Sequence, residues 1–127
     1  MLWNVTRNVV ITRIPHLRRW DELVAALPTR GLDRIKKHLN RIADQKDILT
    51  TSWIPGRDWT GTPYAIIYRI ARGDEILAAR YFGLIVWVVI MERPECWAFG
   101  RYEIKGRPIE GLTYFRVSPA RSRSRRH

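Results

Sequence analysis

Apolar residues recur every three or four positions over two neighbouring stretches in the first third of the chain. Residues 31–44 place Leu32, Ile35, Leu39 and Ile42 at intervals of three, four and three. Residues 17–27 carry a second apolar stripe that ends at Pro28: Leu17, Trp20, Leu23, Val24 and Leu27. This spacing predicts two amphipathic helices. Because about three residues join them, we expect an antiparallel helical hairpin.

Other segments are β-branched or alternate between apolar and polar residues, which predicts strands. Residues 2–13 read as one N-terminal strand that ends before Pro15, and residues 48–54 as a short strand. Residues 97–104 and 112–117 read as the arms of a C-terminal antiparallel β-hairpin, connected by residues 105–111.

The most apolar stretch, residues 81–91, is uncharged and lies between Arg80 and Glu92. At 11 residues it is shorter than the roughly 20 that a membrane-spanning helix needs, so we expect it in the protein core and expect no membrane association. A short helix over residues 63–71 precedes it. Residues 84–90 fit either the end of a helix that starts near Asp74 or a buried strand after Gly83, since periodicity does not separate the two in a uniformly apolar run.

Together these elements predict an α+β fold with an N-terminal strand, a helical hairpin, an apolar central helix and a C-terminal β-hairpin. We expect one globular domain over residues 1–118 and a disordered basic tail over residues 119–127. Helices followed by a hairpin resemble the general plan of a winged helix. The helix before the hairpin is here the most apolar segment, so we expect it to be buried rather than to read a DNA groove.

The net charge of +11 is unevenly distributed. Residues 1–46 hold ten Lys/Arg against four Asp/Glu, and the last ten residues hold four Arg and no acid. This pattern favours a polyanionic partner, DNA or RNA, contacted mainly through phosphates. The candidate residues lie on the basic helix, the hairpin loop and the tail: Arg30, Arg34, Lys37, Arg41, Lys105, Arg107, Arg121 and Arg123.

An alternative is a binding module for a protein or small ligand. The segment 53–64 concentrates aromatic and charged side chains that are suited to line a pocket: Trp53, Arg57, Asp58, Trp59 and Tyr64.

Signals of catalysis are weak. Glu103 and Lys105 have the Glu-x-Lys spacing of metal-dependent nucleases, but Asp58 and Asp74 do not follow a preceding strand as that chemistry requires. The three histidines have no metal-ligand spacing, and Cys96 is the only cysteine. We therefore expect a nonenzymatic protein without a metal or cofactor. The lone cysteine and the absence of an apolar leader favour the cytoplasm.

Overall fold

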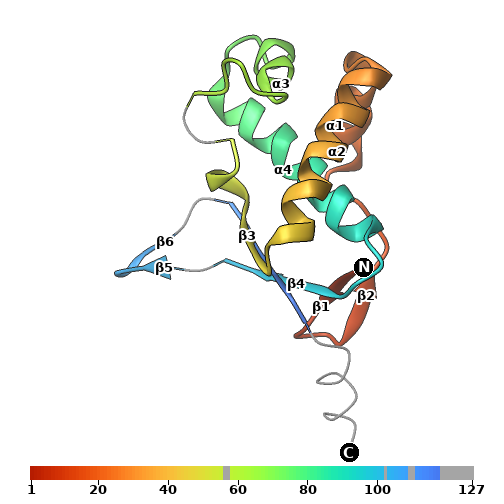
Figure 1. The fold of residues 1–127 in the computed structure, drawn as a ribbon, viewed down its shortest axis with the longest axis vertical. Coiled ribbons are helices and arrows are strands. Elements are labelled where there is room, and N and C mark those ends of the chain that lie inside the picture. Colours follow the sequence, from red (N-terminus) through yellow and green to blue (C-terminus); the bar gives the residue numbers. More distant parts are fainter. Residues whose placement is uncertain (56–57, 102, 109–110, 118–127) are drawn as a thin grey trace, which may run out of the picture.

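The computed structural model describes residues 1–55, 58–101, 103–108 and 111–117. Within these ranges the fold is α+β, with four α-helices and a five-stranded sheet in the order β2-β1-β4-β7-β3. Figure 1 shows the helices gathered on one side of this sheet. The helices are α1 (Leu17–Ala26), α2 (Thr29–Gln45), α3 (Ala65–Ile70) and α4 (Glu75–Glu92). The sheet strands are β1 (Leu2–Asn4), β2 (Val9–Ile11), β3 (Ile48–Thr50), β4 (Trp97–Gly100) and β7 (Thr113–Arg116).

The N-terminal segment forms a hairpin, so the prediction of one continuous strand over residues 2–13 was wrong. β1 and β2 pair antiparallel, with Trp3 opposite Val10. The intervening turn is held by the Arg7 N–H, which donates to Asn4 Oδ1 at 3.1 Å, and by Asn8 in the left-handed region at a φ of 56°. Asparagine tolerates that conformation better than most residues do.

The C-terminal hairpin is confirmed in β4 and β7, which pair antiparallel over four residues each. β1 joins β4 in parallel, and β3 extends the sheet beside β7. β3 is shorter than predicted because residues 51–53 turn into a 3₁₀-helix. On the sheet face opposite the helices, a cross-strand row of apolar residues runs over all five strands: Val10, Trp3, Ala98, Phe115 and Ile48.

The connection between β4 and β7 has its own local structure. β5 (Glu103–Ile104) and β6 (Arg107–Pro108) pair antiparallel around Lys105 and Gly106, whose φ angles are 53° and 77°. Two consecutive positive φ angles identify a type I′ turn. The predicted connection over residues 105–111 therefore begins with a tight turn at Lys105 and Gly106 and a short strand, β6. This small hairpin projects away from the helices (Figure 1).

The apolar run forms a single helix, which decides between the two interpretations of residues 84–90. α4 starts at Asp74, whose carboxylate accepts a hydrogen bond from the Leu77 N–H at 3.1 Å. It continues to Glu92, and nine of its side chains are buried, all but Ala78 of them within residues 81–90. α1, α2 and α3 all pack against it. Among the described residues, no helix is long and apolar enough to cross a membrane.

The helical hairpin packs mainly through α2. Ile35 and Leu39 are buried and Leu32 and Ile42 half-buried, as the spacing predicts. α1 buries a narrower stripe than predicted, because Leu17 and Val24 are 57% and 41% exposed. Figure 1 shows the chain reversing direction between the two helices.

Candidate nucleic-acid interface

The basic side chains of α2 form one exposed stripe. Arg30, Arg34, Lys37 and Arg41 are exposed, and at about 100° per residue they fall within an arc of about 60°. The stripe lies opposite the buried Ile35 and Leu39, so packing of the apolar side fixes its direction. Its length is about 16 Å at about 1.5 Å per residue. That span reaches several successive phosphates of a nucleic-acid strand.

Lys36, which lies on the flank of α2, is paired with a carboxylate, whereas the stripe residues have no such partner among the described residues. Lys36 Nζ lies 2.9 Å from Glu92 Oε1, an ion pair that links α2 to the end of α4. None of the four stripe residues makes an ion pair with any residue that the structure describes. Asp33 lies at the edge of the stripe and is also exposed. The stripe therefore keeps its positive charge available for a partner.

The C-terminal half of α2 is held to the protein by Arg93. This guanidinium donates through Nη1 to the backbone oxygen of Asn40 at 3.1 Å and to Asn40 Oδ1 at 2.8 Å. Its Nη2 donates to Asp44 Oδ1 at 2.6 Å. The side chain is 9% exposed, so these bonds are shielded from solvent on the arginine side. These bonds fix the C-terminal half of α2 relative to the end of α4.

His38 belongs to the protein interior rather than to the stripe. Its Nδ1 is hydrogen-bonded to the hydroxyl of Tyr64. Tyr64 is 1% exposed and packs against Phe82 with ring centroids 4.9 Å apart. Burial raises the pKa of the Tyr64 phenol to about 12. This contact ties α2 to the segment before α3.

Of the other predicted phosphate contacts, Lys105 is the one whose side chain the structure describes, and it does not converge with the stripe. Lys105 is exposed at the tip of the β5–β6 hairpin, well apart from α2 in Figure 1. Arg107 lies in β6, and its side chain is outside the described part of the structure. Arg121 and Arg123 also fall outside the described residues. The structure thus assembles four of the eight candidates into one surface.

The residues of segment 53–64, which the alternative hypothesis places in one ligand pocket, do not all line the same cavity. Asp58 and Trp59 line a cavity of about 570 Å³ together with Tyr68 and Arg69. Trp53 is 62% exposed and lies outside this cavity, and Tyr64 is buried. Arg57 is not among the described residues. Trp59 also packs on Phe82 and Tyr68, which anchors the loop to the core.

A larger groove, of about 900 Å³, was not foreseen from the sequence. Its charged residues include Arg19, Arg80 and Arg101, which come from α1, α4 and the segment after β4. These positions are far apart in the sequence and belong to no motif. The local signal in the sequence was Gly83, which interrupts an otherwise bulky apolar run.

The described residues contain no group of three His, Cys, Asp or Glu side chains that could hold a metal ion. Cys96 is a half-buried free thiol. Comparison of the chain with protein-family models, with curated proteins and with solved structures finds no match.

Proposed function

We propose that the protein is a nonenzymatic nucleic-acid-binding protein that contacts the phosphate backbone through Arg30, Arg34, Lys37 and Arg41. The observation that carries this proposal is an exposed row of four cations that have no carboxylate partner among the described residues, whereas the neighbouring Lys36 is paired. Guanidinium groups make bidentate hydrogen bonds with phosphate oxygens, and lysine adds a point charge. DNA or RNA is the partner whose charges repeat along a line as these do.

The proposed contacts recognise the phosphate charge and do not distinguish the base sequence. Hydrogen bonds to phosphates position a protein on nucleic acid but carry no base information. Asn40, an amide near the stripe that is suited to base recognition, already accepts a hydrogen bond from Arg93. We therefore expect mixed sequences to bind with similar affinity. Lys105 and the Arg-rich tail add separate contacts of the same kind.

The test compares two triple variants of a protein that lacks residues 119–127. One variant changes Arg34, Lys37 and Arg41 to Gln. The control changes Arg18, Arg69 and Arg72, three exposed arginines off the stripe, to Gln. Fluorescence anisotropy with mixed-sequence duplex and single-stranded oligonucleotides measures the affinity between about 50 and 200 mM salt.

The stripe variant is expected to bind more weakly and to lower the salt slope by about two units, at about 0.7 to 0.9 per lost phosphate contact. The control should change the slope much less. Equal losses in both variants would mean that net charge alone attracts nucleic acid. A tailless protein with no measurable affinity at about 50 mM salt would overturn the proposal and favour the ligand-binding alternative at Asp58 and Trp59.

A further inference from the structure

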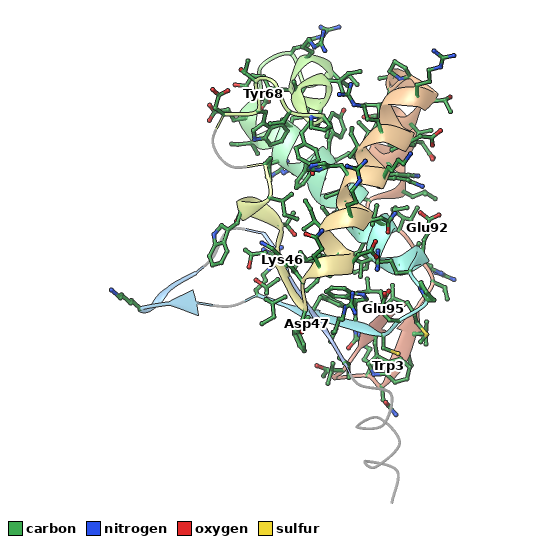
Figure 2. All side chains as sticks on the ribbon, in the orientation of Figure 1. Trp3, Lys46, Asp47, Tyr68, Glu92 and Glu95 are labelled. Atoms are coloured by element: carbon green, nitrogen blue, oxygen red, sulfur yellow. The ribbon has the colours of Figure 1, made fainter. Side chains whose placement is uncertain are left out.

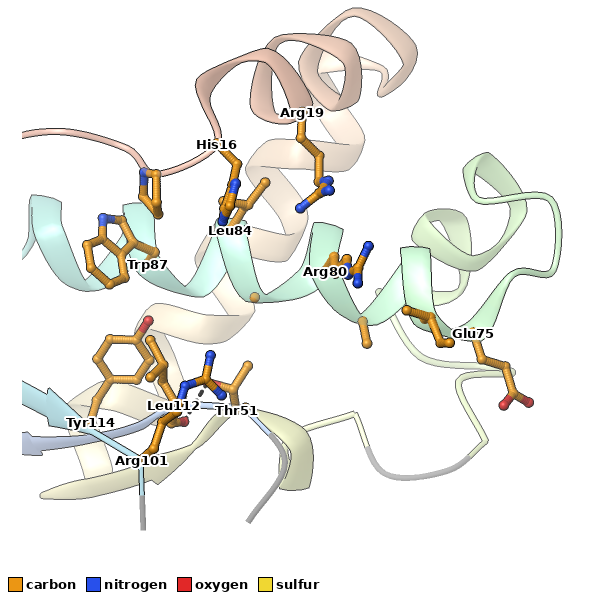
Figure 3. Close-up of a pocket in the computed structure, with 15 residues that line it drawn as sticks. His16, Arg19, Thr51, Glu75, Arg80, Leu84, Trp87, Arg101, Leu112 and Tyr114 are labelled. Atoms are coloured by element: carbon orange, nitrogen blue, oxygen red, sulfur yellow. Dashed lines mark hydrogen bonds between the residues drawn. The ribbon is translucent and has the colours of Figure 1, made fainter. Parts of the chain in front are cut away.

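The large groove lies along α4, between the start of α1 and the end of the sheet. Figure 3 shows His16 and Arg19 on one side of α4, and Arg101, Leu112 and Tyr114 on the other. In this view α2 lies behind α4, so the groove and the α2 stripe are different surfaces. What binds in the groove is therefore a question separate from nucleic-acid binding.

Gly83 leaves an opening in the floor of the groove. It lies within α4, where glycine is less favourable than alanine by about 1 kcal/mol. A Cβ atom at this position would meet no atom within 4 Å, so neither packing nor backbone conformation requires a glycine. Leu84 and Trp87 supply apolar surface beside it. The helix backbone is thus open to close approach by a flat group.

Tyr114 supplies a polar group deep in the same groove. It lies in β7, is 1% exposed and directs its hydroxyl towards α4 (Figure 3). This hydroxyl makes no hydrogen bond with any residue that the structure describes, but unlike Trp97 Nε1 and Arg116 Nε it is not sealed from solvent. A ligand in the groove can accept a hydrogen bond from this hydroxyl in place of water.

The charged residues around the groove favour a negatively charged ligand. Arg19, Arg80 and Arg101 come from three different elements, and none forms an ion pair within the described part of the chain. Glu75 is the acid that lines the groove, and it lies at the far end of α4 in Figure 3. Cations gathered beside apolar walls raise the local concentration of anions.

We propose that this groove binds a small aromatic anion, a flat apolar ring system that carries a carboxylate or phosphate group. The ring lies over Gly83 between Leu84 and Trp87. The anionic group faces the arginines, and one of its oxygens accepts a hydrogen bond from the Tyr114 hydroxyl. Apolar walls with a few convergent polar groups are typical of small-molecule sites.

Isothermal titration calorimetry with 1-naphthoate and 1-naphthyl phosphate tests the proposal and distinguishes the two anionic groups. At least one is expected to bind with a Kd on the order of 0.1 mM. The neutral analogue 1-naphthalenemethanol should bind at least about tenfold more weakly, and acetate should not bind. Failure of both anions to bind at millimolar concentration, or equal binding of the neutral analogue, would overturn it.

Three variants locate the site. Gly83→Leu should abolish binding, because its side chain occupies the open floor, and circular dichroism should show the fold retained. Tyr114→Phe should weaken binding about fivefold by removing one hydrogen bond. Arg80→Gln should weaken it about tenfold, whereas the matched control Arg72→Gln, at an exposed arginine outside both the groove and the stripe, should leave it unchanged.

A folded Gly83→Leu protein that binds as tightly as the wild type would overturn the location. If that variant does not fold, Tyr114→Phe decides, since it deletes an unpaired hydroxyl without changing the packing. Unchanged affinity in Tyr114→Phe would show that the hydroxyl contacts no ligand and would refute the proposed site. Loss of oligonucleotide binding in the α2 variants has no bearing on these outcomes.

Discussion

Arg93 binds both carboxylate oxygens of Glu95, with Nε donating to Oε2 and Nη2 donating to Oε1 at 2.9 Å each. Figure 2 shows Glu95 beside the junction between the helices and the sheet. The same guanidinium holds Asn40 and Asp44 of α2. One side chain therefore links the end of α4, the start of β4 and the helix that carries the basic stripe.

This pair should make the stability of the protein depend on acid pH. The hydrogen bonds from Arg93 lower the pKa of Glu95 from 4.5 to about 2. The stabilisation is therefore complete above about pH 4.5 and is lost as the pH falls towards 2, because the unfolded chain binds the proton first. Glu95→Gln should reduce the slope of stability against pH in this window. Urea denaturation between pH 2 and 6 measures it, and parallel profiles for the two proteins would contradict the assignment.

The apolar residues 81–91 of α4 should contribute most of the packing energy. Ile90 is 1% exposed, so Ile90→Ala is expected to cost about 2–5 kcal/mol. Ile76 is 67% exposed on the same helix, and Ile76→Ala should stay within about 0.5 kcal/mol of the wild type. Chemical denaturation of both variants provides the comparison. Equal stabilities would show that α4 is not the core element.

Tyr64 should make the protein sensitive to alkali. Burial raises the pKa of its phenol to about 12, and burial also raises the pKa of Tyr114. An unfolded tyrosine ionises near pH 10, so stability is complete below that pH and falls as the pH rises towards 12. Ultraviolet titration should show two phenols that ionise only with unfolding.

At the tip of the β5–β6 hairpin, one substitution can remove a positive charge without disturbing the turn. Lys105 has a φ of 53° in a type I′ turn, a position that asparagine adopts more readily. Lys105→Asn should therefore maintain or slightly raise the melting temperature while removing one positive charge. If Lys105 contacts a phosphate, the salt slope of oligonucleotide binding falls by about 0.7 to 0.9. An unchanged slope would remove the hairpin from the proposed interface.

The elements fixed by local pattern could be predicted from the sequence. The period of Leu32, Ile35 and Leu39 determined both the helix and the exposed side that carries the arginines, because a helix with one apolar stripe has one way to face a core. Residues 81–91 are the most apolar segment of the chain, and this was enough to predict that they form the central element of the core. Its helical state could not be predicted, since a segment buried on all sides has no period to read.

Only the tertiary structure decided the relationships between distant segments. The parallel pairing of Leu2 with Trp97 joins residues far apart in the chain and depends on how the intervening helices pack. The groove likewise collects Arg19, Arg80 and Tyr114 from three elements, and no local pattern encodes their meeting. The division at Asn8 was missed because alternation predicts strand residues without locating a turn, which the positive φ of one residue sets. The spacing of apolar residues predicts whether a side chain is buried or exposed. Which residues it contacts depends on how the whole chain packs.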